Sequence, residues 1–91
     1  METNVRDLLN EMGMTDSIVF ENPNYDSAII GYDMVSNRII YDYELMIQHL
    51  MENDGMEYDE AAEFIDYNTI RATPYAGGLA PIILYNLKDE L

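Results

Sequence analysis

Carboxylates are the residues whose number and spacing in this chain could do chemistry. The segment 42–66 contains nine of them and no Lys or Arg, and six of the nine lie within residues 52–63. Carboxylates gathered in this way could bind a metal ion, exchange protons with a substrate, or accept hydrogen bonds from Arg and Lys side chains of another protein. The nine residues are Asp42, Glu44, Glu52, Asp54, Glu57, Asp59, Glu60, Glu63 and Asp66.

Metal binding is poorly matched by the spacing of these residues. Oxygen ligands suit Ca²⁺ or Mg²⁺, but a calcium-binding loop places a ligand Asp five residues before its Gly. The residue five positions before Gly55 is Leu50. The chain also has no Cys, which excludes disulfides, Fe–S clusters and cysteine-ligated zinc. We therefore expect no bound metal and no cofactor.

Catalytic residues are equally scarce. His49 is the only His, and its position inside a predicted helix is more typical of a packing or hydrogen-bonding residue than of a general base. No Ser lies in a nucleophile elbow, and no Gly-rich loop leads from a strand into a helix. Since the chain contains 18 acidic residues, pairs of carboxylates arise by chance. We predict no catalytic residue and no enzymatic activity.

The net charge indicates what the chain could bind. It is −14 at pH 7, because 18 Asp and Glu residues stand against four Lys and Arg. A field of this sign repels nucleic acid and anionic membranes and attracts basic protein surfaces. No apolar run approaches the roughly 20 residues that a membrane span needs. We expect a basic protein as the partner, with no direct contact to nucleic acid or membrane.

Tyrosines accompany the acidic segment and suggest an interface. Tyr offers apolar area with a polar tip, so it is common in binding surfaces. Of the eight Tyr residues, Tyr58, Tyr67 and Tyr75 flank the acidic residues. Three others lie in predicted strands and are expected to be mostly structural: Tyr32, Tyr41 and Tyr85. The predicted partner-binding residues are Glu52, Asp54, Glu57, Tyr58, Asp59, Glu60, Glu63, Asp66 and Tyr67. The alternative interpretation of these residues is a solvated polar face.

Three helices are predicted to position these residues. The first covers residues 3–12, and the second covers residues 43–54, with Asp42 as its N-cap and Gly55 at its end. The third begins near Glu57 and forms an αα-hairpin with the second. The predicted apolar faces of the first two helices consist of Val5, Leu8, Leu9, Met12, Met46, Ile47, Leu50 and Met51.

Four short strands complete the predicted fold. They cover residues 17–21, 27–33, 38–42 and 81–86, and the second and third form a β-hairpin. The last is almost entirely apolar, so it should be covered by helices. We therefore predict one α+β domain spanning residues 1–91, in the order α-β-β-β-α-α-β. A small antiparallel sheet of three or four strands is packed by the N-terminal helix and the αα-hairpin.

The second half of the chain resembles a family of short bacterial and phage proteins. The shared features are a YDY helix start (Tyr41–Tyr43), an acidic second helix (Glu60–Ala62), an FIDYNTIRA segment (Phe64–Ala72) and a closing PIIxY strand (Pro81–Tyr85). The resemblance covers about residues 38–86 and implies no activity, so no functional residue is carried over from it. By size and charge the chain is also similar to small acidic phage proteins that block host defence, among them anti-CRISPR proteins.

The last four residues, Lys88–Leu91, spell the ER-retention signal. That signal acts only on a protein that has entered the secretory pathway. The acidic, polar-interrupted start of the chain has no signal-peptide core. We interpret the match as coincidence and expect a cytoplasmic location in a bacterial host.

These observations lead to two hypotheses from different classes. The first is a phage or mobile-element inhibitor, anti-CRISPR-like, whose acidic helix pair mimics DNA and covers the nucleic-acid-binding site of a basic host protein such as a defence nuclease. Carboxylates on rigid helices can occupy the places of phosphates, each accepting forked bonds from Arg. The alternative is a structural module that forms homodimers or larger homo-oligomers through an apolar face or the edge strand at residues 81–85.

Overall fold

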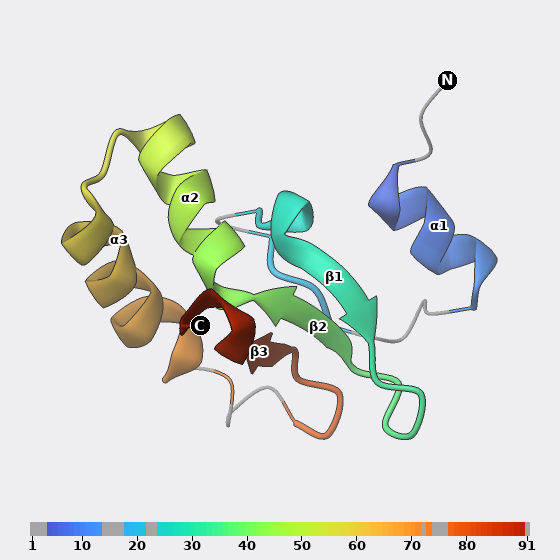
Figure 1. Ribbon diagram of the computed structural model, residues 1–91. Helices are drawn as coiled ribbons and strands as arrows, with labels where there is room; N and C mark the ends of the chain where they lie inside the picture. The colour runs from blue at the N-terminus through green and yellow to red at the C-terminus, as the bar shows by residue number, and fades with distance from the viewer. Residues whose placement is uncertain (1–3, 14–17, 22–23, 72, 74–76, 91) are drawn as a thin grey trace.

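The computed structural model describes residues 4–13, 18–21, 24–71, 73 and 77–90. Within these ranges the chain is a small α+β fold of helices and one mixed sheet, which confirms the predicted fold class (Figure 1). The helices and strands are α1 (Val5–Glu11), β1 (Ile29–Tyr32), β2 (Ile39–Asp42), α2 (Tyr43–Asp54), α3 (Tyr58–Ile65) and β3 (Ile82–Leu84). Short helical turns are η1 (Asp26–Ala28), the π-helical η2 (Asp66–Ile70) and η4 (Leu87–Glu90).

The predicted β-hairpin is formed by β1 and β2, which pair in antiparallel fashion. Their register places Tyr32 opposite Ile39 and Gly31 opposite Ile40, and it shifts between Ile29 and Gly31. This irregularity agrees with the expectation that a glycine inside a strand marks a bulge. Asn37 has a φ of 60° in the connecting turn, a left-handed conformation that Asn adopts more readily than most residues.

The third strand corrects one part of the prediction, because β3 pairs with β2 in parallel and the sheet is therefore mixed. The chain leaves β2 directly into α2, and α3 and η2 then carry it back, so it re-enters the sheet in the direction of β2. Parallel strands require such a crossover of a dozen or more residues. Arg38 fixes the entry to β3, because its Nε donates a 2.6 Å hydrogen bond to the carbonyl oxygen of Ala80.

The strand predicted at residues 17–21 is not a strand where the structure describes it. Ser17 lies outside the described residues, residues 18–20 have no regular structure, and Glu21 makes an isolated bridge with Asn24. Side chains take the place of a neighbouring strand here. The amide of Phe20 donates to the Tyr41 hydroxyl at 2.9 Å, and its carbonyl accepts a 3.2 Å bond from Arg6 Nη2.

The core lies between the β-hairpin and the helix pair. Met46, Ile47 and Leu50 of α2 are completely buried, as the helical spacing predicts, whereas Met51 remains 38% exposed. The other members of the buried cluster are Leu9, Tyr25, Ala28, Ile39, Tyr41, Ala61 and Ile65. Since burial of a large apolar side chain contributes about 1.5–3 kcal/mol, this cluster holds the helix pair against the sheet.

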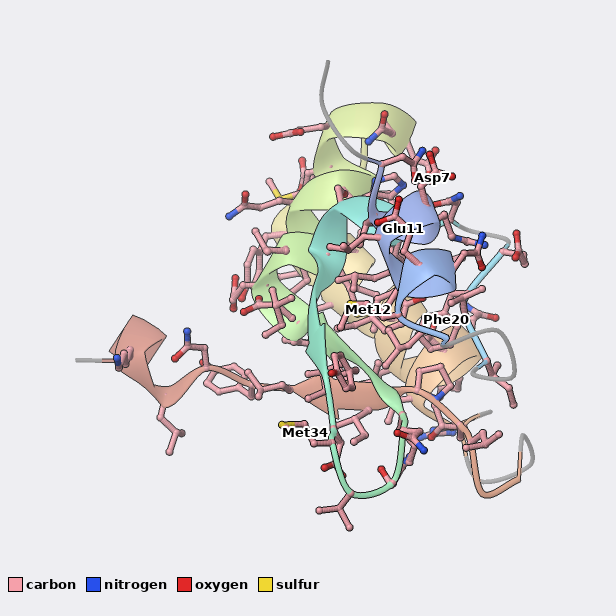
Figure 2. The ribbon with its side chains drawn as sticks, turned by 90° about the vertical axis from the view of Figure 1, so that its right-hand side faces the viewer. Asp7, Glu11, Met12, Phe20 and Met34 are labelled. Carbon is pink, nitrogen blue, oxygen red and sulfur yellow. The ribbon has the colours of Figure 1, made fainter. Side chains whose placement is uncertain are left out.

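The N-terminal helix is attached mainly by one arginine. Figure 1 shows α1 on the opposite flank of the molecule from α2 and α3, beyond the hairpin. Of its predicted apolar stripe only Leu9 is buried, whereas Leu8 and Met12 are exposed. Arg6 donates from Nε to both carboxylate oxygens of Asp26 and from Nη1 to Glu21. The flank that carries α1 faces the viewer in Figure 2.

Candidate partner-binding site

All nine predicted partner-binding residues have exposed side chains. The αα-hairpin places Glu52, Asp54 and Glu57 around its connection, because α2 ends at Asp54 and α3 begins at Tyr58, whereas Asp66 and Tyr67 lie beyond the other end of α3, in η2. Gly55 closes α2 in the left-handed conformation, with a φ of 71°. The carboxylates among the nine form what we call the acidic surface: Glu52, Asp54, Glu57, Asp59, Glu60, Glu63 and Asp66.

Helix capping explains two of these carboxylates locally. Glu57 and Glu60 form a capping box at the start of α3, in which the Glu57 amide donates to Glu60 Oε1 at 3.4 Å. Such a box satisfies amide groups that would otherwise lack a partner in the first turn. Asp59 also lies in the first turn, where the helix dipole favours negative charge. These acids therefore stabilise the helix as well as contributing to its charge.

Glu63 of α3 and Asp66 at the start of η2 take no part in this capping. Asp59, Glu63 and Asp66 are spaced by four and three residues, so they follow one stripe, separated along the helix axis by about 6 and 4.5 Å. Like charges at this spacing destabilise a helix by about 0.2–0.5 kcal/mol per pair. Among the residues that the structure describes, Asp59 and Glu63 have no Arg or Lys partner, unlike the carboxylates bound by Arg6.

Tyr58 connects the two helices by a hydrogen bond. Its hydroxyl donates to Glu44 Oε1 at 2.6 Å, so the start of α3 is bonded to the start of α2. The bond to this carboxylate raises the pKa of Tyr58 to about 12. Glu44 is therefore part of the site. It is one of the nine acidic residues of segment 42–66, but it was not among the predicted partner-binding residues.

Tyr67 already holds a cation of the same chain. The guanidinium carbon of Arg71 lies 4.3 Å from the centre of the Tyr67 ring, a cation–π arrangement. Arg71 follows directly after η2, at the end of the helical segment. Tyr67 is therefore placed beside the acidic surface with one face of its ring occupied. Tyr75, the third predicted interface tyrosine, lies outside the described residues.

A pocket beside the acidic surface was not predicted. It has a volume of about 300 Å³ and is lined by Tyr43, Ile70, Ile83 and Tyr85. The rings of the two tyrosines lie 6.1 Å apart between centroids, at an angle of 43°. We call this the tyrosine pocket.

The parallel pairing of β2 and β3 creates the tyrosine pocket. In this register Asp42 lies opposite Leu84, so the next residues, Tyr43 and Tyr85, leave the paired ends side by side. An antiparallel pair would have directed the two chains apart at this point. The YDY and ILY segments are visible in the sequence, but their meeting depends on strand direction, which local patterns do not reveal.

Two carboxylates affect the hydroxyl of Tyr43, one of the residues that line the tyrosine pocket. Burial is the main cause that raises the pKa of Tyr43, and the charges of Asp66 and Glu44 raise it further. Both carboxylates are therefore close enough to act on the Tyr43 hydroxyl. The walls of the pocket itself are apolar and aromatic.

His49 takes part in packing on the opposite side of α2. Its Nδ1 lies 3.5 Å from Ser27 Oγ and 3.2 Å from Asn53 Nδ2, and its ring meets that of Tyr25 edge-on at 5.5 Å. Within the described ranges, no three His or acidic side chains are grouped so as to hold a metal ion. Nor does any helix of these ranges have the length and apolarity to cross a membrane.

Comparisons of the chain with family models, with curated proteins and with solved structures found no match. The resemblance of residues 38–86 to short bacterial and phage proteins therefore stays a prediction. The features of the molecule that bear on its function are the acidic surface and the tyrosine pocket.

Proposed function

We propose that this protein is a non-enzymatic inhibitor, phage- or mobile-element-encoded and anti-CRISPR-like, that binds the nucleic-acid-binding surface of a basic host protein. The acidic surface of α2 and α3 makes the contact and takes the place of DNA. The observation that carries the proposal is the exposure of all seven carboxylates of this surface. The protein acts in the cytoplasm of a bacterial host, and the ER-type ending plays no part.

The contrast with other carboxylates supports this use of the surface. Asp26 and Glu21 bind Arg6, and Asp33 accepts bonds from the Val35 amide and the Ser36 hydroxyl within its own turn. These acids have structural partners. The stripe of Asp59, Glu63 and Asp66 instead repels itself along α3 and into η2, a cost that is understandable if the charges meet a cationic surface.

The chemistry of recognition follows from the spacing on a rigid helix. A DNA strand advances by about 3.4 Å per phosphate, and the acidic stripe advances by about 4.5–6 Å per carboxylate. A carboxylate accepts forked hydrogen bonds from Arg as a phosphate does. Complementary charge also accelerates the encounter, which suits an inhibitor that must compete with nucleic acid.

Capture from a bacterial lysate tests the proposal. The protein is immobilised and the bound proteins are eluted first with double-stranded DNA and then with about 0.5 M NaCl, which shortens the range of surface electrostatics to a few ångströms. A bait carrying Asp59→Lys and Glu63→Lys serves as the control. We expect a basic nucleic-acid-binding protein, released by DNA and absent from the control. Recovery of neutral or acidic proteins alone, unaffected by salt, would contradict the proposal.

A second function is favoured by the position of β3. In the described sheet β3 lies at an edge, beside β2, and an unpaired edge can add the strand of another copy. On this alternative the protein is a structural module that forms a homodimer and has no nucleic-acid mimicry. Light scattering separates the two functions, because a stable symmetric dimer without a lysate partner supports the module and a monomer supports the inhibitor.

A further inference from the structure

The turn between β1 and β2 carries the two most exposed large apolar side chains of the described residues. Met34 is 81% exposed and Val35 is 92% exposed. Figure 2 labels Met34 in this turn of the hairpin. Methionine usually fills gaps in cores and interfaces, but here its thioether stands in water. A thioether in this position is open to oxidation, because a dissolved oxidant can reach the sulfur.

Asp33 fixes the shape of this turn through polar groups. Its Oδ1 accepts a 3.0 Å hydrogen bond from the Val35 amide, and its Oδ2 accepts a 2.8 Å bond from the Ser36 hydroxyl. Its carbonyl oxygen accepts a further 2.8 Å bond from the Asn37 amide. None of these three bonds uses the side chain of Met34. A chemical change at the Met34 sulfur should therefore leave the turn intact.

The other methionines whose side chains the structure describes are better protected. Met12 on α1 is 46% exposed and Met51 on α2 is 38% exposed. Met56 is partly buried against the core cluster, and Met46 lies completely inside it. Oxidation makes methionine polar and disrupts a core, so Met46 can react only when the fold opens. The fold therefore ranks these methionines, and Met34 comes first.

We infer that Met34 is a site of reversible oxidation by hydrogen peroxide. The thioether sulfur takes one oxygen atom from the peroxide, the O–O bond breaks, and water leaves. The sulfur is oxidised by two electrons and the peroxide is reduced by two. Methionine sulfoxide reductases restore the thioether at the expense of a dithiol, which becomes a disulfide as the oxygen leaves in water.

Oxidation of Met34 changes the surface of the protein and not its fold. The exposed apolar tip of the hairpin becomes polar, while the Asp33 hydrogen bonds and the buried cluster stay as they are. The acidic surface lies on α2, α3 and η2, outside this turn. The inference is therefore independent of the proposed function.

Peptide mapping by mass spectrometry tests the ranking of the methionines. The folded full chain is treated with hydrogen peroxide at neutral pH, and the sulfoxide fraction at each methionine is followed over time. We expect Met34 to react about twofold faster than Met12 and Met51, in line with their exposed fractions, and Met46 to stay unmodified. In urea the rates should become equal. Equal rates at Met34 and Met12 in the folded protein, or a preference for Met34 that persists in urea, would overturn the inference.

A second measurement tests whether the modification spares the fold and can be reversed. Met34→Leu keeps an apolar tip without the sulfur and serves as the matched control. After the same treatment, the wild type and Met34→Leu should unfold at the same urea concentration. Reductases for both sulfoxide epimers, supplied with dithiothreitol, should remove the sulfoxide at Met34 from the folded wild type. Destabilisation of the oxidised wild type alone, or a sulfoxide that is reduced only after unfolding, would contradict the inference.

Discussion

The Tyr58 hydroxyl donates a 2.6 Å hydrogen bond to the Glu44 carboxylate and thereby joins the first turns of α3 and α2. The two residues are 14 positions apart in the chain, and neither is buried. Their bond holds the starts of the two helices that carry the acidic surface together, since Glu44 lies in the first turn of α2 and Tyr58 begins α3. The orientation of the site therefore depends on a protonated tyrosine.

Alkaline pH should loosen this connection. The pKa of Tyr58 is raised from 10.0 to about 12 in the folded protein, mainly by the bond to Glu44. A raised pKa means that the bond stabilises the fold fully below pH 10 and that this stabilisation is lost as the pH rises through about 12. Ring resonances of Tyr58 should titrate near pH 12 in the wild type and closer to 10 in Glu44→Gln. A midpoint near 10 in both proteins would show that the bond is absent.

The N-cap of α2 should contribute measurably to stability. Asp42 Oδ1 accepts a 3.0 Å bond from the Leu45 amide at the point where β2 becomes α2. Asp42→Ala leaves that amide without its cap and should lower the free energy of unfolding by about 1 kcal/mol, measured by urea denaturation. Asp42→Asn retains a capping oxygen and should cost much less. Equal losses in the two variants would assign the effect to something other than capping.

Arg6 should be the main attachment of α1. It bonds Asp26, Glu21 and the carbonyl of Phe20, although its side chain is 29% exposed. Arg6→Met keeps the apolar stem and should lower the free energy of unfolding by about 1–2 kcal/mol, with faster hydrogen exchange in α1. Arg71→Met, which removes a cation only from the face of Tyr67, serves as the matched control with a smaller effect. A larger loss for Arg71→Met would contradict this assignment.

Salt should act on stability and binding in opposite directions. The net charge of −14 makes the folded chain repel itself, and screening relieves that repulsion. The melting temperature should therefore rise between dilute buffer and about 0.5 M NaCl, whereas affinity for a basic partner should fall over the same range. Thermal denaturation and binding isotherms at both salt concentrations measure the two effects. A melting temperature that falls with salt would contradict the idea of a self-repelling surface.

Local signals in the sequence predicted the helix pair well. Asp42 and Gly55 cap the two ends of α2 as expected, because caps depend on residues within one turn, and Glu57 lies at the start of α3, as its N-cap, for the same reason. The exposure of the predicted acidic residues also follows from their chemistry. These features required no knowledge of which distant segments meet.

Features that depend on distant contacts were missed. The segment around Phe20 resembles a strand, but Tyr41 and Arg6 bond its backbone in place of a neighbouring strand. The direction of β3 depends on how two helices return the chain, and the tyrosine pocket depends on that direction. The apolar period of α1 predicted Leu8 and Met12 as core residues, yet the helix contacts the body mainly through Leu9 and Arg6.

The most direct test of the account compares two matched pairs of carboxylates. Both pairs consist of exposed carboxylates four residues apart: Asp59 and Glu63 on α3, and Asp7 and Glu11 on α1. Figure 2 shows the second pair on the flank that carries α1. The measurement is the affinity for the basic protein captured from the lysate. One double variant carries Asp59→Asn and Glu63→Gln, and the other carries Asp7→Asn and Glu11→Gln. We predict about tenfold weaker binding for the α3 pair and less than about twofold for the α1 pair. Equal weakening by both pairs would show that only total charge matters and would contradict a binding surface on α2 and α3.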